Sequence, residues 1–229
     1  MKDVSAFDIK KRLRVAEIEK ETGKNDNSFI IDFLDSVGKA TRDISVDEIQ
    51  NAINLLYEGW KRQAKIFIIG MGGSASTASH FACDLSKWTI IEGAMRFRVM
   101  ACTDNAALIT GYANDEGLHS IFVEQIKAWI EPGDILVGVS VHGGAGEGNA
   151  GAWSQNIVGA MKYAKEQGAK LLGITGFDGG AMKRMCDVSI IVPNSDPVIG
   201  IPLVEGYHVL VLHLMCAALR AKLQRAVKR

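Results

Sequence analysis

A chain of 229 residues with 26 basic and 26 acidic side chains carries no formal net charge, which argues against a nucleic-acid-binding surface and a polybasic membrane anchor. Hydrophobic residues make up 48% of the chain, enough to fill the core of one domain of this length. The four cysteines are far apart and form no Cys-x-x-Cys pair, so we expect free thiols in a reducing cytoplasm rather than a zinc ribbon or a redox motif.

The N-terminal part of the chain is predicted to be helical. Residues 4–21 form a charged helical pattern, and 28–37 form a second segment with apolar periodicity. A third helix is predicted over 45–62, with Ser45 as its N-cap. Because these helices carry more apolar residues than a solvated tail needs, we expect 1–63 to be an N-terminal helical segment that mediates oligomerisation.

Alternating strands and helices are predicted for the remainder of the chain. Continuous runs rich in Val, Ile and Leu are typical of parallel strands buried on both faces. These runs lie at 65–70, 97–102, 135–140, 170–175 and 188–192. Helical patterns fill the intervals, at about 75–88, 117–129, 154–168 and 202–226. The alternation predicts a single α/β domain over 1–229, with a doubly wound, five-stranded parallel sheet and helices on both of its faces.

Neither end of the chain carries a recognisable membrane signal. The N-terminus is charged, without an apolar signal segment, and the longest apolar run, 209–219, is too short to span a bilayer. The basic stretch 220–229 is predicted to be a solvated helix end. We therefore expect a cytoplasmic protein with neither a membrane nor a nucleic acid among its partners.

The most informative segment is the glycine-rich turn after the first predicted strand, Gly70-Met71-Gly72-Gly73-Ser74, which leads into a helical pattern. Backbone N–H groups and the helix dipole suit such a helix start to an anion, and glycines allow close approach. The hydroxyls of Ser74, Ser76 and Thr77 would add donors. A relaxed dinucleotide fingerprint, a tight turn without a ligand and a sugar-phosphate cradle are the three interpretations. The cradle fits best and no nucleotide cofactor is expected, because neither an acidic ribose ligand nor a Walker Gly-Lys-Ser/Thr follows at the required distance.

Hydroxyl groups and glycines also gather at the carboxyl ends of the other predicted strands, where a doubly wound sheet binds its ligand. These segments are 102–105, 140–144 and 175–176, and none contains Lys or Arg. An anion bound at this edge would therefore be held by hydroxyls, backbone amides and helix dipoles.

The chain resembles the sugar isomerase (SIS) domain family, and within it the phosphoheptose isomerases, over nearly its whole length. The resemblance rests on the order and spacing of the segments 70–74, 80–85, 113–117, 132–140, 175–180 and 205–208, with His213 beyond them. It implies an enediol isomerase that interconverts sedoheptulose 7-phosphate and a heptose 7-phosphate, in a homotetramer with sites between subunits. A non-catalytic SIS protein that binds a sugar phosphate or a partner protein, such as a replication initiator, is the alternative.

The resemblance also implies the site residues. The acid/base pair falls on Asp84 and His213. Some members bind one zinc or similar divalent ion per site through positions that match His80, Asp84, Glu205 and His213. With the glycine turn included, the substrate and phosphate contacts fall on Gly72, Gly73, Ser74, Asn114, Asp115, Ser140 and Ser154.

Three departures from the family pattern are visible. Asp84 stands in place of a glutamate, and Glu205 stands in place of a glutamine. The loop after the third strand is longer than is usual and carries His142 where a serine is expected. An imidazole beside a phosphate site can donate to the phosphate or serve as an acid/base, so we add His142 to the candidate substrate-binding residues.

The spacing of the four candidate metal ligands can be compared with helix geometry. His80 and Asp84 lie at i and i+4, on one face of one helix. Glu205 and His213 are eight positions apart, or about 12 Å of axial rise, so they share an ion only if Glu205 leans in from the helix start. We expect all four side chains to converge near one point.

Overall fold

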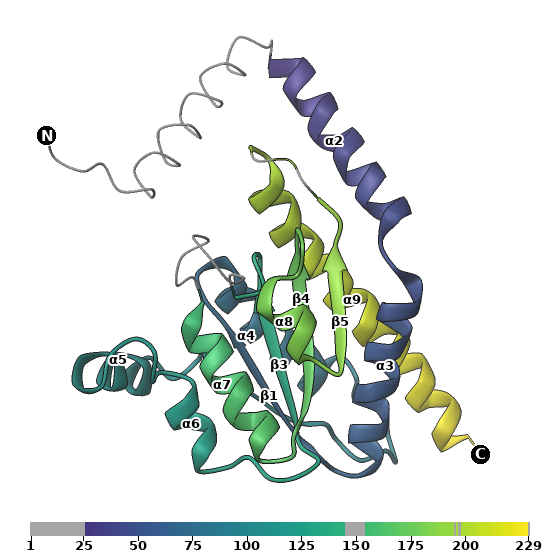
Figure 1. Ribbon diagram of the computed structural model, residues 1–229. Coiled ribbons are helices and arrows are strands. Elements are labelled where there is room, and N and C mark those ends of the chain that lie inside the picture. Colours follow the sequence, from purple (N-terminus) through teal and green to yellow (C-terminus); the bar gives the residue numbers. More distant parts are fainter. Residues whose placement is uncertain (1–25, 145–153, 195, 197, 229) are drawn as a thin grey trace, which may run out of the picture.

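The computed structural model describes residues 26–144, 154–194, 196 and 198–228, which are coloured in Figure 1. Two helices, α2 (Asp26–Asp43) and α3 (Val46–Lys61), precede the sheet. The start of α3 is confirmed, because the Ser45 hydroxyl oxygen accepts the backbone N–H of Glu48 at 3.2 Å. The helix predicted over 4–21 lies outside the described residues.

Five parallel strands form one sheet in the order β2-β1-β3-β4-β5, which confirms the predicted doubly wound fold. The strands are β1 (Lys65–Gly70), β2 (Arg98–Ala101), β3 (Ile135–Ser140), β4 (Lys170–Gly176) and β5 (Val188–Val192). Gly70 pairs with Val139, and Ser140 pairs with Thr175, so the carboxyl ends of the three central strands lie at one edge. From β1 the chain adds β2 on one side and then β3, β4 and β5 on the other, so the strand order reverses between β1 and β3, and the crevice at that switch point is where such a sheet binds its ligand.

Helices cover both faces of the sheet and make two apolar cores (Figure 1). Successive side chains of a strand point to opposite faces, so Ile66 and Ile68 enter one core while Phe67 and Ile69 enter the other. The first core lies under α3, α4 (Gly73–Lys87) and α9 (Gly200–Val227). The second lies under α6 (Val123–Lys127), α7 (Gln155–Glu166) and α8 (Gly180–Met185). Burial on both faces explains why the three central strands are continuous apolar runs.

Three helices differ from the prediction, and one of them is the short helix α8, which was not predicted. The segment α5 (Ala106–Asp115) was not predicted, and it projects from the body without burying any of its own residues (Figure 1). Its N-cap, Asn105, accepts the Leu108 N–H at 3.1 Å, and this cap was the available sequence signal. The helix predicted over 117–129 is reduced to α6, because the chain turns at Gly117 with a φ of +96°.

The C-terminal helix α9 is long and apolar enough, by length and composition, to cross a membrane. However, 44% of its most apolar window is buried inside the domain, where it packs against α3, α4 and β4. We therefore interpret α9 as a core helix. Of the four free cysteines, Cys102 and Cys216 are buried and Cys83 is exposed.

A pH dependence of stability is expected from His208, a fully buried residue of α9. Burial lowers the pKa of its imidazole to about 4, and the backbone of Thr175 only partly offsets that shift. The unfolded chain binds this proton below about pH 6.5, whereas the folded chain stays neutral down to about pH 4, so stability falls as the pH drops through this window. The free energy of unfolding in urea should decrease by about 2 kcal/mol between pH 7 and pH 5 from this residue alone.

The matched variants are His208→Leu and His119→Gln, the latter altering an exposed histidine. His208→Leu should have a smaller loss of stability between the two pH values, whereas His119→Gln should behave as the wild type. Identical pH dependence in His208→Leu and wild type would contradict this role for His208.

Candidate active site

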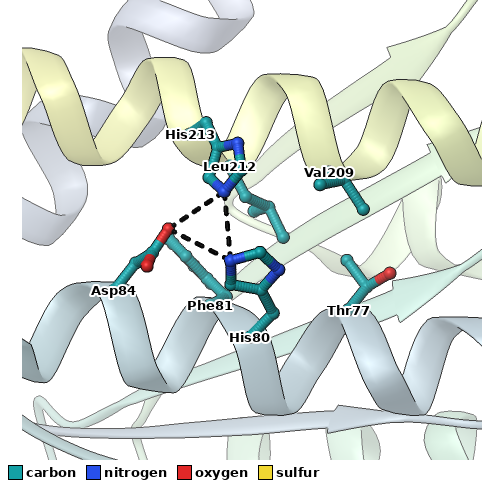
Figure 2. A pocket seen from close by; sticks show the side chains of 7 residues that line it. All are labelled: Thr77, His80, Phe81, Asp84, Val209, Leu212 and His213. Atoms are coloured by element: carbon teal, nitrogen blue, oxygen red, sulfur yellow. Dashed lines mark hydrogen bonds and ion pairs between the residues drawn. The ribbon is translucent and has the colours of Figure 1, made fainter.

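Helices α4 and α9 bring three predicted site residues to one point, as Figure 2 shows. The Asp84 Oδ2 atom lies 3.2 Å from Nε2 of His213 and 3.7 Å from Nε2 of His80. The two Nε2 atoms are 3.1 Å apart, and the two rings meet edge to face with centroids 4.7 Å apart. We refer to His80, Asp84 and His213 as the His-Asp-His cluster.

The periodicity of the two helices orients the His-Asp-His cluster. On α4, Phe81 and Leu85 are buried in the core, so His80 and Asp84 lie along a face directed at α9. On α9, Leu212 is buried beside His213. The imidazole side chains of His80 and His213 are 47% and 52% exposed, whereas the Asp84 side chain is 21% exposed. A substrate can therefore reach the cluster from the outer surface.

Apolar side chains form the floor of the cluster. Figure 2 shows Phe81 and Leu212 behind the three polar side chains, with Val209 and Thr77 further along the same helices. The depression lined by these residues is shallow because α4 and α9 are in direct contact. Water is thus excluded from below the cluster, which strengthens the electrostatic interactions within it.

The distances within the His-Asp-His cluster suit a single divalent cation. Zinc binds imidazole nitrogen and carboxylate oxygen at about 2.0–2.2 Å in tetrahedral geometry, which places ligand atoms about 3.3–3.6 Å apart. The three separations in the cluster, 3.1, 3.2 and 3.7 Å, are close to that spacing. Three protein ligands with an open fourth position are typical of catalytic rather than structural zinc sites.

Glu205 does not join the cluster, and the expectation that all four candidate ligands converge is wrong for this residue. Its carboxylate lies against the first residue of α4, since a Cβ atom added to Gly73 would be 2.4 Å from Oε1 and 2.7 Å from Oε2. Glu205 and His213 are eight positions apart on α9, which separates them by about 12 Å along the helix axis. Because α4 lies beside α9, the two side chains face different turns of α4.

The glycine turn after β1 has the predicted geometry of a strand-to-helix turn. Gly72 is the N-cap of α4 with a φ of +58°, a conformation that favours glycine, and Ser74 is buried in the first turn. The hydroxyls of Ser76 and Thr77 both donate to the Gly73 carbonyl oxygen, at 2.7 and 3.1 Å. These two hydroxyls are therefore engaged within α4, contrary to the expectation that they add donors for an anion.

Two serines separated by fourteen positions meet at the end of β3. The hydroxyl oxygens of Ser140 and Ser154 are 3.3 Å apart. Ser140 is the last residue of β3 and is buried, whereas Ser154 precedes α7 in a left-handed conformation with a φ of +58°. Because β1 and β3 are neighbours, this serine pair and the glycine turn lie on the same edge of the sheet, at its switch point.

The loop that begins at His142 is held against α8. The His142 ring stacks on Phe177 with centroids 4.8 Å apart and an interplanar angle of 26°. The carbonyl oxygens of Gly143 and Gly144 accept the N–H groups of Met182 and Ala181, both at 2.9 Å. Residues 145–153 of this loop lie outside the described residues, so the structure places the imidazole beside Phe177 without testing its contact with a substrate.

Asn114 and Asp115 lie at the C-terminal end of the projecting helix α5. Both side chains are exposed, and Asn114 Nδ2 donates to Asp115 Oδ1 at 2.7 Å. The structure does not include them in the group around His80 and His213.

One residue that joins α4 to α9 was missed in the sequence. Arg220 lies seven positions after His213 on α9, close to two helical turns, and its Nη1 atom donates to the Trp88 and Ile90 carbonyl oxygens at 2.5 and 3.0 Å. Its guanidinium also lies 5.2 Å from the Trp88 ring centroid. Arg220 therefore caps the end of α4, about 10 Å along α9 from His213, and a basic residue in a C-terminal helix was its only signal in the sequence.

Comparison with known proteins gives a consistent result. Residues 31–176 match the SIS domain family. The lincomycin biosynthesis protein LmbN of Streptomyces lincolnensis is 40% identical over 191 residues, which are 83% of this chain and 68% of that protein. A phosphoheptose isomerase of Helicobacter pylori (strain P12) is 36% identical over 168 residues, which are 73% of this chain and 80% of that protein.

A solved structure extends this similarity. The phosphoheptose isomerase GmhA from Neisseria gonorrhoeae aligns with a TM-score of 0.71 at 25% identity. The alignment covers 89% of this chain and 99% of that one. The structural alignment and the sequence matches thus identify relatives of the same kind, the phosphoheptose isomerases.

Proposed function

This chain belongs to the SIS domain family, and we propose that it is a sugar-phosphate isomerase that interconverts a ketose phosphate and an aldose phosphate. We infer sedoheptulose 7-phosphate as the substrate, because phosphoheptose isomerases are similar to this chain over most of both lengths. The observation that carries the proposal is the meeting of His80, Asp84 and His213 on the surface of this fold. The enzyme is proposed to act in the cytoplasm.

Proton transfer through an enediol accounts for the reaction. Asp84 takes a proton from C1 of the ketose, the C–H electron pair forms a C1=C2 double bond, and the C2 oxygen gains a proton. A proton returned to C2, with loss of the proton on the C1 oxygen, gives the aldose. His213 is 3.2 Å from Asp84, so it is positioned to carry the proton between the two oxygens.

We further propose that the His-Asp-His cluster holds one divalent ion, zinc by the character of its donors. Such an ion, when bound, supplies a Lewis acid for the carbonyl end of the sugar. A bound ion would occupy lone pairs of Asp84 and His213 that proton transfer also needs. Measuring metal content and activity side by side therefore distinguishes the ligand role from the acid/base role.

The phosphate is proposed to bind at the switch point of the sheet. Gly72, Gly73 and Ser74 supply the turn at the start of α4, and Ser140 and Ser154 supply the serine pair at the start of α7. Helix dipoles and hydroxyls there would provide binding energy remote from the reacting carbons. As further substrate contacts we propose His142, Asn114 and Asp115.

The assay that tests the proposed function is turnover of sedoheptulose 7-phosphate by the purified chain, followed by NMR. Formation of an aldose phosphate supports the isomerase. Binding of the sugar phosphate without turnover, in protein with its full metal content, supports instead the non-catalytic alternative.

A homotetramer with sites between its subunits is proposed for the assembly. Four apolar side chains of α2 are between 41% and 61% exposed, namely Phe29, Ile30, Ile31 and Leu34. Ile53 and Leu56 of the next helix are buried within the chain itself and are not available for this contact. A solvated helix rarely exposes an apolar patch of this kind, so we expect subunits to cover it.

Light scattering at micromolar concentration should give four times the chain mass for the wild type. The double variant Ile31→Asp, Leu34→Asp should give a lower mass, because two charges would be buried at the contact. The control is Val46→Asp, which alters a valine that is 75% exposed at the start of α3. A monomeric wild type would refute the assembly.

A further inference from the structure

Glu205 places a negative charge on the loop proposed to bind phosphate. Its carboxylate is close enough to Gly73 that any side chain there would overlap it, with 2.4 Å from the added Cβ to Oε1. The first turn of α4 has no acidic residue of its own, so α9 supplies the charge at this helix start. A carboxylate is stabilised at the positive end of a helix, in the region that a bound phosphate would also occupy.

Among the described residues, no ion pair neutralises this carboxylate. The segments 70–74, 140–144 and 175–180, which form the carboxyl edge of the three central strands, contain no Lys or Arg. Asp178 adds a further acidic residue to that edge. A phosphate at the glycine turn would therefore lie near a like charge, which opposes its binding.

We propose that Glu205 is a specificity-determining residue that selects a phosphate carried by a polyhydroxy sugar over free inorganic phosphate. The inference rests on the proposed function and concerns the same site. The carboxylate repels any phosphate at the glycine turn, whether free or esterified. It accepts hydrogen bonds from sugar hydroxyls next to an esterified phosphate, and these offset the repulsion for the sugar phosphate alone.

Selection of this kind combines an unfavourable interaction, the repulsion of phosphate by the carboxylate, with a favourable one, the hydrogen bonds from sugar hydroxyls. Inorganic phosphate is abundant in cells and would compete for a cradle of amides and hydroxyls that recognises the phosphate alone. A nearby carboxylate weakens that competitor, while the hydroxyl contacts restore affinity for the substrate.

Titration calorimetry with inorganic phosphate and with sedoheptulose 7-phosphate tests the proposal on wild type and Glu205→Gln. Glutamine keeps the shape of the side chain and removes its charge. Glu205→Gln should bind inorganic phosphate at least about tenfold more tightly, because one like charge is gone. Its affinity for the sugar phosphate should rise less, so the ratio of the two Kd values should fall.

The matched control is Glu166→Gln, which removes one exposed carboxylate at the far end of α7. It should leave both affinities unchanged. A tighter Kd for inorganic phosphate in Glu205→Gln, with zinc content equal to that of the wild type, separates charge selection from a ligand role for Glu205.

Equal or weaker binding of inorganic phosphate by Glu205→Gln would overturn the proposal. So would a gain in which both affinities rise by the same factor. Failure of the wild type to bind the sugar phosphate would instead refute the proposed function, while the inorganic phosphate titrations would still decide whether Glu205 opposes anions.

Discussion

Replacing Asp84 by asparagine is expected to lower kcat/KM for sedoheptulose 7-phosphate by about a thousandfold. The carboxylate is the proposed base, and a correctly placed general base contributes about a hundredfold to ten-thousandfold in rate. Asparagine has nearly the same shape but accepts no proton. It also loses the charge that faces the Nε2 atoms of His80 and His213, at 3.7 and 3.2 Å.

Initial rates measured by NMR, with circular dichroism to confirm folding, check this result. His213→Gln should show a comparable loss, and the double variant should be little worse than either single variant, because the two residues act as a unit. Cys83→Ser changes an exposed neighbour on α4 and serves as the control with near wild-type rates. A folded Asp84→Asn enzyme with more than about a tenth of wild-type activity would remove Asp84 from this role.

Removing either imidazole of the His-Asp-His cluster is expected to abolish metal binding. The donor atoms of His80, Asp84 and His213 lie within 4.8 Å of one another, so one ion can contact all three. With one of three protein ligands gone, affinity for zinc should fall by more than about a hundredfold, at least as much as loss of an outer-shell partner costs.

Elemental analysis after zinc supplementation and dialysis provides the measurement. Wild type should retain about one equivalent of zinc per chain, as expected for one site. His80→Ala and His213→Ala should retain almost none. His119→Ala, which removes an exposed histidine on another part of the chain, should match the wild type. A metal-free wild type that is fully active would assign Asp84 and His213 to acid/base work alone.

The sheet could be predicted from the sequence because both of its faces are buried. Phe67 and Ile69 enter one core and Ile66 and Ile68 the other, so β1 appears as an unbroken apolar run. The projecting helix α5 buries none of its residues, so it carries no comparable pattern. Its only local indication was the N-cap Asn105.

The candidate site could be predicted only in part. His80 and Asp84 share one helix, where spacing alone places them on one face. The meeting with His213 depends on how α4 packs against α9, and the family resemblance supplied that partner. The same packing keeps Glu205 beside Gly73, a contact that no local pattern reveals because it joins residues far apart in the sequence. The pairing of Ser140 with Ser154 likewise arises from the fold rather than from local sequence.

The most direct test of an enediol reaction at the His-Asp-His cluster is the isomerisation of sedoheptulose 7-phosphate in D₂O. The side chains of His80 and His213 are about half exposed, at 47% and 52%, so a proton taken from the sugar can exchange with solvent before it returns. NMR should show deuterium at C2 of the aldose phosphate formed by the wild type, and both product formation and exchange should be about a thousandfold slower with Asp84→Asn. An aldose phosphate whose C2 carries only protium transferred from C1 of the ketose, with no deuterium, would contradict proton transfer at this solvent-exposed cluster.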